Sequence, residues 1–157
     1  MNEWPLLSQV YEAYSTKVKF SYHLLPLPYH QYSFILGKSA NVVDLVGESG
    51  DVFNFIDAAF IPTNQALVYN GVTADTTYNE MLQIVSGFVA NTTSISSADY
   101  LDAMATNSDA EMNTRYSFKA SALESMYGTP MFKVNGVAVG GLNSFEQWEA
   151  ALDSLLA

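Results

Sequence analysis

The sequence predicts a helix-rich α/β fold, α+β by content, in which a helical domain is inserted into a smaller core. Residues 18–23 alternate apolar and polar side chains before Leu24-Leu25, which is the pattern of a strand with one face buried more deeply than the other. Helical patterns fill residues 29–127, and two short apolar runs joined by Asn135-Gly136 then predict a hairpin. We therefore expect a core built from residues 1–28 and 128–157 and an inserted helical domain at residues 29–127.

The N-terminal part of the core is expected to be a helix followed by a strand. Large apolar side chains recur at steps of three and four residues and so share one helical face: Trp4, Leu7, Tyr11 and Tyr14. Pro5 falls in the first turn, where proline is tolerated. The strand begins near Val18, and Pro26-Leu27-Pro28 ends it because proline cannot donate to a strand ladder.

The inserted block is expected to consist of helices. Apolar spacing predicts three of them, over residues 39–46, 51–60 and 76–89, and Pro62 stops the second. Two later helices begin at pairs of hydroxyl and carboxylate residues that can cap a first turn, Ser96 with Asp99 and Ser108 with Glu111. The second of these is expected to reach Tyr127, with Gly128 at its C-terminal cap.

The C-terminal part of the core is expected to be a hairpin followed by a helix. Residues 131–134 and 137–139 are short apolar runs, and Asn-Gly between them is the strongest signal for a two-residue turn. Ser144 with Gln147 then predicts the capped start of a last helix. The side chains expected on its inner side are Phe145, Trp148, Leu152 and Leu155.

The composition excludes several classes of partner and site. The 157 residues carry a net charge of -10, and no basic residue lies between Lys38 and Arg115. Such an acidic surface repels nucleic acid and anionic membranes, so neither is expected as a partner. The chain has no cysteine, and its two histidines, His23 and His30, are too few for a metal cage, so no metal or cofactor is expected.

The chain as given carries no signal for targeting to a membrane. It has no apolar stretch of the ~20 residues that a membrane span requires, and no signal-peptide pattern at its start. We therefore expect a soluble protein, and the compartment stays open. Asn91-Thr92-Thr93 is an acceptor pattern for N-glycosylation, which applies only if a chain extended at its N-terminus enters a secretory lumen.

Four segments carry a resemblance to a known family by their order and spacing. They are residues 4–7 (Trp-Pro-Leu-Leu), residues 20–30 ending in Pro-Leu-Pro-Tyr-His, residues 115–119, and Gly128–Gly136. Together they resemble the DsbA-like type of the thioredoxin-like superfamily, in which a helical domain is inserted into a thioredoxin fold. The resemblance covers nearly the whole chain.

The same resemblance identifies what this sequence lacks. Family members begin with an interior strand that leads into a Cys-x-x-Cys motif at the start of the first helix, where the helix dipole lowers the thiol pKa. Met1 falls about where that motif ends, so neither the strand nor the cysteines can be transferred. We expect a thioredoxin-like fold that is incomplete at its N-terminus. Either the chain has been shortened upstream, or a partner, a second copy or a rearranged sheet covers the exposed strand edges.

The resemblance implies a site for substrate at Gly128, Thr129 and Pro130. In the family this proline is cis, and its loop presents its backbone to an extended peptide, with Thr129 making the side-chain contact. We therefore expect a cis bond before Pro130, with a trans turn as the alternative. His30 stands where the family has a histidine, but a local hydrogen bond at a helix start explains it better than catalysis, since no nucleophile lies beside it.

These observations favour a redox-inactive module that binds an extended polypeptide or a protein partner near Pro130, with no catalytic residue in the chain as given. Homodimerisation by strand exchange is a further form of partnership. One alternative is a thiol-disulfide oxidoreductase, similar to protein disulfide isomerase, whose catalytic segment is missing from this chain. The other is a glutathione-transferase-like enzyme, which would need a polar start to the first helix, where Asn2 stands.

Overall fold

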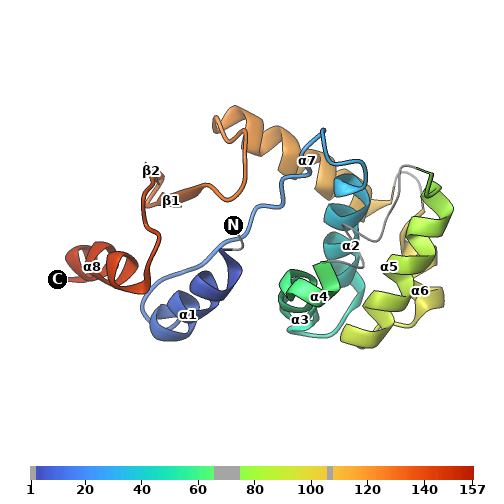
Figure 1. Ribbon diagram of the computed structural model, residues 1–157, viewed down its shortest axis with the longest axis horizontal. Coiled ribbons are helices and arrows are strands. Elements are labelled where there is room, and N and C mark those ends of the chain that lie inside the picture. The colour runs from blue at the N-terminus through green and yellow to red at the C-terminus, as the bar shows by residue number, and fades with distance from the viewer. Residues whose placement is uncertain (1–2, 66–74, 106–107) are drawn as a thin grey trace. The chain divides into compact units, whose positions relative to one another are not determined.

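The chain divides into two compact units. The computed structural model describes residues 3–65, 75–105 and 108–157. One unit, here called the terminal unit, combines the chain up to His23 with Gly128–Ala157. The other, here called the helical unit, is Leu24–Tyr127 (Figure 1). The two units are described separately below.

The terminal unit contains two helices and one hairpin. In chain order these are α1 (Trp4–Tyr14), β1 (Phe132–Val134), β2 (Val137–Val139) and α8 (Phe145–Leu156). Asn135 and Gly136 both have positive φ angles, 50° and 80°, as the predicted two-residue turn requires. Ser144 and Gln147 form the predicted capping box of α8, in which each side chain accepts from the other residue's backbone N–H.

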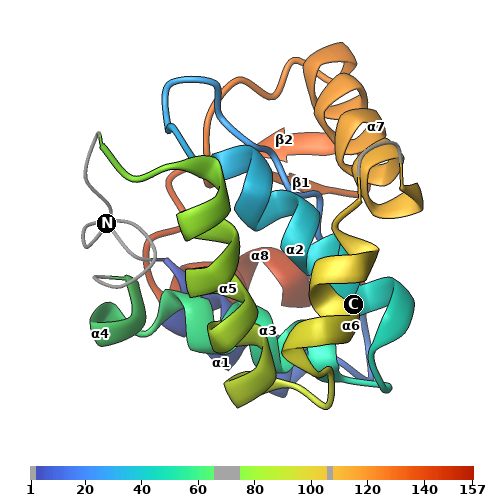
Figure 2. The ribbon, with the colours of Figure 1, turned by 90° about the vertical axis from the view of Figure 1, so that its right-hand side faces the viewer.

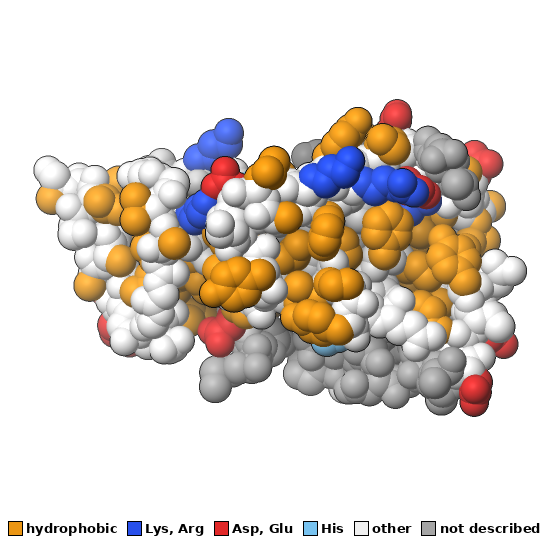
Figure 3. Space-filling model, turned by 90° about the horizontal axis from the view of Figure 1, so that it is seen from above, with side chains coloured by type: hydrophobic (Ala, Val, Ile, Leu, Met, Phe, Trp, Pro, Cys, Tyr) orange, Lys and Arg blue, Asp and Glu red, His pale blue; other side chains and the backbone are white. Residues whose placement is uncertain are grey.

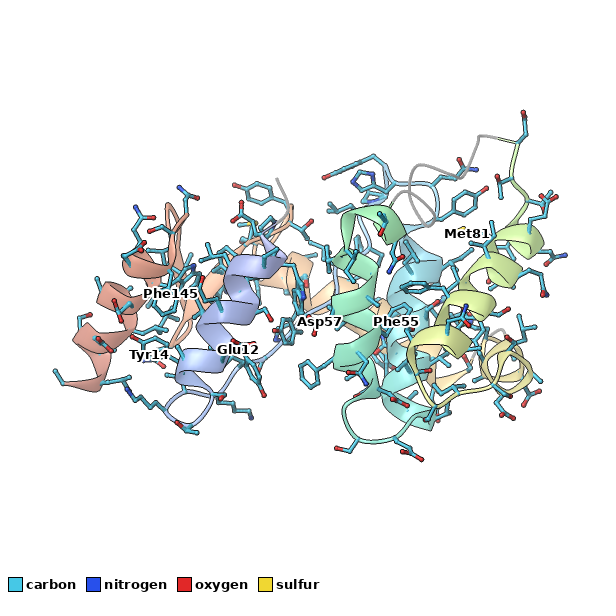
Figure 4. All side chains as sticks on the ribbon, turned by 60° about the horizontal axis from the view of Figure 1, so that its bottom comes forward. Glu12, Tyr14, Phe55, Asp57, Met81 and Phe145 are labelled. Atoms are coloured by element: carbon cyan, nitrogen blue, oxygen red, sulfur yellow. The ribbon has the colours of Figure 1, made fainter. Side chains whose placement is uncertain are left out.

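The core of the terminal unit lies where α1 packs on α8. Its buried side chains are Val10, Tyr14, Trp148 and Leu152, and the partly buried ones around them include Phe132 and Val139 of the hairpin. The Tyr14 hydroxyl donates to Asp153 at 2.9 Å, so a hydrogen bond also joins the two helices. Burial, followed by this carboxylate, raises the pKa of Tyr14 to about 12. Figure 4 shows Tyr14 on α1 and Phe145 on α8 in the space between these helices.

The helical unit is a bundle arranged around one central helix. Its elements are α2 (Ser33–Val46), α3 (Asp51–Phe60), α4 (Pro62–Gln65), α5 (Tyr78–Thr92), α6 (Ser97–Ala103) and α7 (Asp109–Leu123). Helix α2 contacts α3, α5, α6 and α7 (Figures 1 and 2). The fully buried side chains at these contacts include Val42, Val43, Met81, Val85, Val89 and Tyr100. Phe55 of α3 meets Phe88 of α5 edge-on at 5.6 Å.

The predicted strand at residues 18–25 is wrong. Residues 19–27 make no strand ladder, and among the described residues the sheet contains β1 and β2 alone. The alternation describes side-chain burial instead, because Val18 and Phe20 pack on the core while Lys19 and Ser21 are exposed. A strand needs a hydrogen-bonding partner as well as an alternating pattern. The sheet of a thioredoxin fold is therefore absent from the part of the chain that the structure describes.

Several predicted helix limits also need correction. Helix α2 spans Ser33–Val46 and so includes the predicted residues 39–46, while α5 spans Tyr78–Thr92 rather than residues 76–89. Helix α7 ends at Leu123 rather than at Tyr127, because Ser125 adopts a left-handed conformation, with φ 59°, and Met126 N–H donates to Ser121 O at 2.8 Å. This closure uses serine where glycine is usual, so Gly128 is not the C-cap. Leu155, predicted on the inner side of α8, is exposed.

The helices of the structure do not meet the requirements for a membrane span. Within residues 3–65, 75–105 and 108–157, no helix combines the length and the apolar character that crossing a bilayer demands.

Candidate functional site

The predicted substrate loop, Gly128–Pro130, lies in the terminal unit directly before β1. The peptide bond between Thr129 and Pro130 is cis, as the sequence predicted. Thr129 and Pro130 are exposed, and Gly128 is half-buried. Met131, which joins the loop to β1, exposes 37% of its surface. The loop is therefore accessible to a second molecule.

The strand after this loop is held firmly on the core of the terminal unit. Phe132 meets Trp148 of α8 edge-on, with ring centroids 5.1 Å apart and an interplanar angle of 88°. On its other side Phe132 is paired with Val139, and Val134 with Val137, in the antiparallel register. One end of the loop is thus fixed by packing and by a strand ladder, which limits the orientations that its backbone can take.

The backbone of the loop has unused hydrogen-bonding groups. Among the described residues, no hydrogen bond reaches the main chain of Thr129 or Met131. Pro130 has no N–H, so it offers a carbonyl alone. Exposed N–H and C=O groups on either side of a proline are suited to pairing with an extended main chain.

His30 belongs to the helical unit, in the turn before α2. Its N–H donates to Leu27 O at 3.1 Å, and its carbonyl accepts from Ser33 N–H at 3.0 Å. The exposed imidazole stacks edge-on against Tyr29 at 4.8 Å. These contacts agree with the local structural role that the sequence favoured for this histidine. His23 is likewise exposed, at the boundary of the terminal unit.

Asn91 is exposed in the last turn of α5. The Thr93 hydroxyl, which completes the acceptor pattern, donates to Val89 O at 2.8 Å and so closes the end of the helix. The structure therefore gives the threonine of the pattern a structural role. Modification of Asn91 stays a prediction.

A buried charge network that the sequence analysis missed lies in the helical unit. Lys38 of α2 is 1% exposed, and its ammonium donates to the carbonyls of Met104 and Ala105, each at 3.0 Å, and to Glu111 at 2.9 Å. All three N–H groups of the ammonium are used. Glu111 also accepts from Arg115. Hydrogen bonding from Lys38, opposed by burial, lowers the pKa of Glu111. With its donors satisfied, this network joins α2 to the end of α6 and the start of α7.

A second buried carboxylate, Asp51, fixes the start of α3. It accepts from Glu48 N–H at 3.0 Å, and from both the backbone N–H and the hydroxyl of Ser94. The hydroxyl hydrogen bond is the largest cause that lowers the pKa of Asp51 below its ordinary value of 3.8. The carboxylate therefore joins α3 to the loop between α5 and α6.

We expect Asp51→Asn to destabilise the protein most near neutral pH. A carboxyl group with a lowered pKa in the folded state stabilises that state above its ordinary pKa, and this contribution disappears as the pH falls through the folded-state value. The difference in urea midpoint between Asp51→Asn and the natural sequence should therefore shrink as the pH falls below 3.8. The exposed carboxylate Asp44 provides the control, since Asp44→Asn should change the midpoint little. A pH-independent difference for Asp51→Asn would contradict this account.

Among the described residues, no other side-chain cluster combines the groups that a binding or catalytic site needs. The described residues contain no group of three or more His, Cys, Asp or Glu side chains that could hold a metal ion. An open depression of about 370 Å³ in the helical unit is lined by Val46, Ser94, Ile95, Asp99, Asp102 and Ala103. Within the described chain, no buried polar atom without a partner belongs to its lining.

Comparison with known proteins identifies no relative of this chain. No protein-family model, no curated protein and no solved structure matches this chain. The resemblance to the DsbA-like type therefore stays a prediction from the sequence, and function has to be argued from the geometry of the loop.

Proposed function

We propose that this protein is a polypeptide-binding module without redox chemistry in the chain as given, and that an extended segment of another polypeptide docks on the Gly128–Pro130 loop. One observation carries the proposal: the loop is exposed, and the strand that follows it is fixed to the core of the terminal unit. Thr129 and Met131 have main-chain groups free of hydrogen bonds within the described structure, while the next residue, Phe132, is fixed against Trp148. A preorganised backbone loses little entropy when a ligand binds.

The chemistry of the loop favours a peptide over a small-molecule substrate. Its accessible polar groups are main-chain N–H and C=O groups and the Thr129 hydroxyl. No charged side chain belongs to residues 128–131, so the loop offers no charged group to an ionic ligand. Main-chain hydrogen bonds supply affinity for extended peptides regardless of their sequence. The absence of cysteine leaves no thiolate for disulfide exchange in these residues.

A calorimetric titration with a defined peptide tests the proposal. The probe is a short peptide that alternates threonine and valine, with two glutamines at each end to keep it soluble. Its control replaces the valines with prolines, which cannot donate main-chain hydrogen bonds. We expect the first peptide to bind and the second to bind at least about tenfold more weakly. Equal affinity for both peptides, or no binding of either, would count against the proposal.

We expect Thr129→Glu to weaken binding of the threonine-valine peptide at least about tenfold, because the peptide would have to desolvate the new carboxylate. Thr129 is exposed, so the substitution should leave the fold intact. Thr16→Glu makes the same change at an exposed turn of the terminal unit and is expected to bind like the natural sequence. An unchanged affinity of Thr129→Glu would place the peptide elsewhere.

A further inference from the structure

The turn of the β1–β2 hairpin, Asn135-Gly136, lies open to solvent. Both residues are exposed. A Cβ placed on Gly136 would have no heavy atom of another part of the chain within 4 Å. Among the described residues, no hydrogen bond reaches the side-chain amide of Asn135 or the main-chain N–H of Gly136. The turn therefore places an unoccupied side-chain amide next to an unoccupied main-chain amide.

The other asparagines of the described residues stand in different surroundings. Apart from Asn135, only Asn143 lies outside the helices. The main-chain N–H that follows it belongs to Ser144 and donates to the Gln147 side chain at 3.1 Å, as part of the α8 capping box. The remaining asparagines lie within helices, where the helical conformation holds the next main-chain amide. Asn70-Gly71 lies outside the described residues.

An asparagine whose next main-chain nitrogen is free can react with that nitrogen. The Gly136 nitrogen attacks Cγ of Asn135, the N–Cγ bond forms, the Cγ–Nδ2 bond breaks, and ammonia leaves with the proton of the Gly136 N–H. Glycine favours this approach because it has no Cβ. Water then opens the cyclic succinimide. Hydrolysis at Cγ leaves an aspartate, and hydrolysis at the main-chain carbonyl leaves an isoaspartate, whose main chain runs through Cβ and Cγ and is one carbon longer.

Ring closure requires the turn to leave its hairpin conformation, and the hairpin is built to open at this end. Strands β1 and β2 have three residues each. Phe132 fixes the far end of β1 against Trp148, whereas the pair next to the turn is Val134 and Val137, and Val137 is 66% exposed. A two-stranded ladder of this length has little stability of its own, so local opening is expected at the turn.

We propose that Asn135-Gly136 is a site of spontaneous deamidation, and that its isoaspartyl product uncouples β1 from β2. A two-residue turn sets the register of its hairpin, and an added main-chain carbon beside the Val134–Val137 pair breaks that register. The aspartyl product keeps the ordinary main chain, and Asp-Gly suits the same turn.

The two products carry the same added negative charge, so they differ in the main chain alone. The terminal unit has five acidic and three basic side chains, a small share of the chain's net charge of -10. At the left of Figure 3, where this unit lies, few charged side chains are visible. One more exposed carboxylate therefore has little effect on stability, and the longer main chain of the isoaspartyl product is the cause of the expected damage.

Peptide mapping by mass spectrometry tests the site after the full chain has been incubated at neutral pH. Fragmentation that cleaves the Cα–Cβ bond of isoaspartate distinguishes the two products at each asparagine. We expect both products at Asn135, formed at least about tenfold faster than any product at Asn143, because the Ser144 amide must first leave its hydrogen bond. The variant Asn135→Gly keeps a Gly-Gly turn and removes the reacting amide, so it should show no conversion at this position. A synthetic peptide with the sequence of residues 132–139 sets the time scale of the reaction without the fold.

Hydrogen exchange tests the structural consequence. The isoaspartyl form is separated by ion exchange, and the amides of β1 and β2 should lose protection in it. The variant Asn135→Asp carries the same charge on an ordinary main chain and should keep that protection.

Three results would overturn the proposal. Asn135 could remain unmodified in the full chain for the time in which the synthetic peptide is converted, which would show that the hairpin protects it. Conversion at Asn143 as fast as at Asn135 would show that the free Gly136 amide does not select the site. Equal protection of β1 and β2 in the isoaspartyl form and in Asn135→Asp would remove the proposed uncoupling of the strands.

Discussion

Lys38→Met is expected to lower the free energy of unfolding by about 3–5 kcal/mol, which is typical when one partner of a buried ion pair is removed. The substitution leaves the Glu111 carboxylate buried with Arg115 as its remaining cationic partner, and it removes the donors that Met104 O and Ala105 O now use. Urea unfolding followed by far-UV circular dichroism measures the loss. The matched control is Lys119→Met, which changes an exposed lysine on α7 and should cost little.

A second substitution separates the buried charge from the packing. Glu111→Gln in the Lys38→Met background removes the buried negative charge that has lost its buried partner, so the double variant should recover part of the loss. The loss in Lys38→Met should also be greatest above the ordinary pKa of 4.5 of a glutamate and decline as the pH falls through the lowered folded-state pKa of Glu111. A loss no larger than that of Lys119→Met would show that the network contributes little to stability.

Trp148→Ala is expected to cost about 3–5 kcal/mol in the terminal unit, through lost apolar burial and the cavity left behind. Trp148 is 6% exposed and packs with Val10, Tyr14 and Leu152 in the small core of this unit. Hydrogen exchange resolved by residue measures the effect, and the amides of α1 and α8 should lose protection. Leu155→Ala, on the exposed side of α8, is the control and should leave that protection unchanged.

Trp148→Phe refines this prediction. The Trp148 indole N–H is buried and has no hydrogen-bond partner among the described residues. Phenylalanine removes that unsatisfied donor and keeps an aromatic ring against Phe132, so its cost should be clearly smaller than that of Trp148→Ala. Equal protection in Trp148→Ala and the natural sequence would contradict the assignment of this core.

The features predicted correctly from the sequence depend on residues close together in the chain. Asn135-Gly136 specifies its turn because both positions need positive φ, and Ser144 with Gln147 caps α8 from three residues away. The strand at residues 18–25 failed because alternation specifies which side chains face the core and leaves the hydrogen-bonding partner undetermined. The end of α7 was missed because Ser125 takes a conformation that favours glycine.

In the candidate site, too, features that depend on neighbouring residues could be predicted, and contacts between distant residues could not. The loop at Thr129-Pro130, including its cis bond, could be predicted from the resemblance that residues 128–136 carry. The Lys38–Glu111 pair joins residues 73 positions apart, so no local pattern connects them, although a lysine within an apolar helical segment was a signal of burial.

The central claim is that Gly128–Pro130 binds an extended polypeptide, and nitrogen-proton correlation spectra during titration with the threonine-valine peptide test it most directly. The account predicts progressive shifts of the backbone amides at Thr129, Met131 and Phe132, with the amides of α3 and α5 in the helical unit unchanged. It also predicts that Thr129→Glu abolishes those shifts and that Thr16→Glu does not. Shifts confined to Leu24–Tyr127, or a spectrum unaffected by the peptide, would contradict the claim.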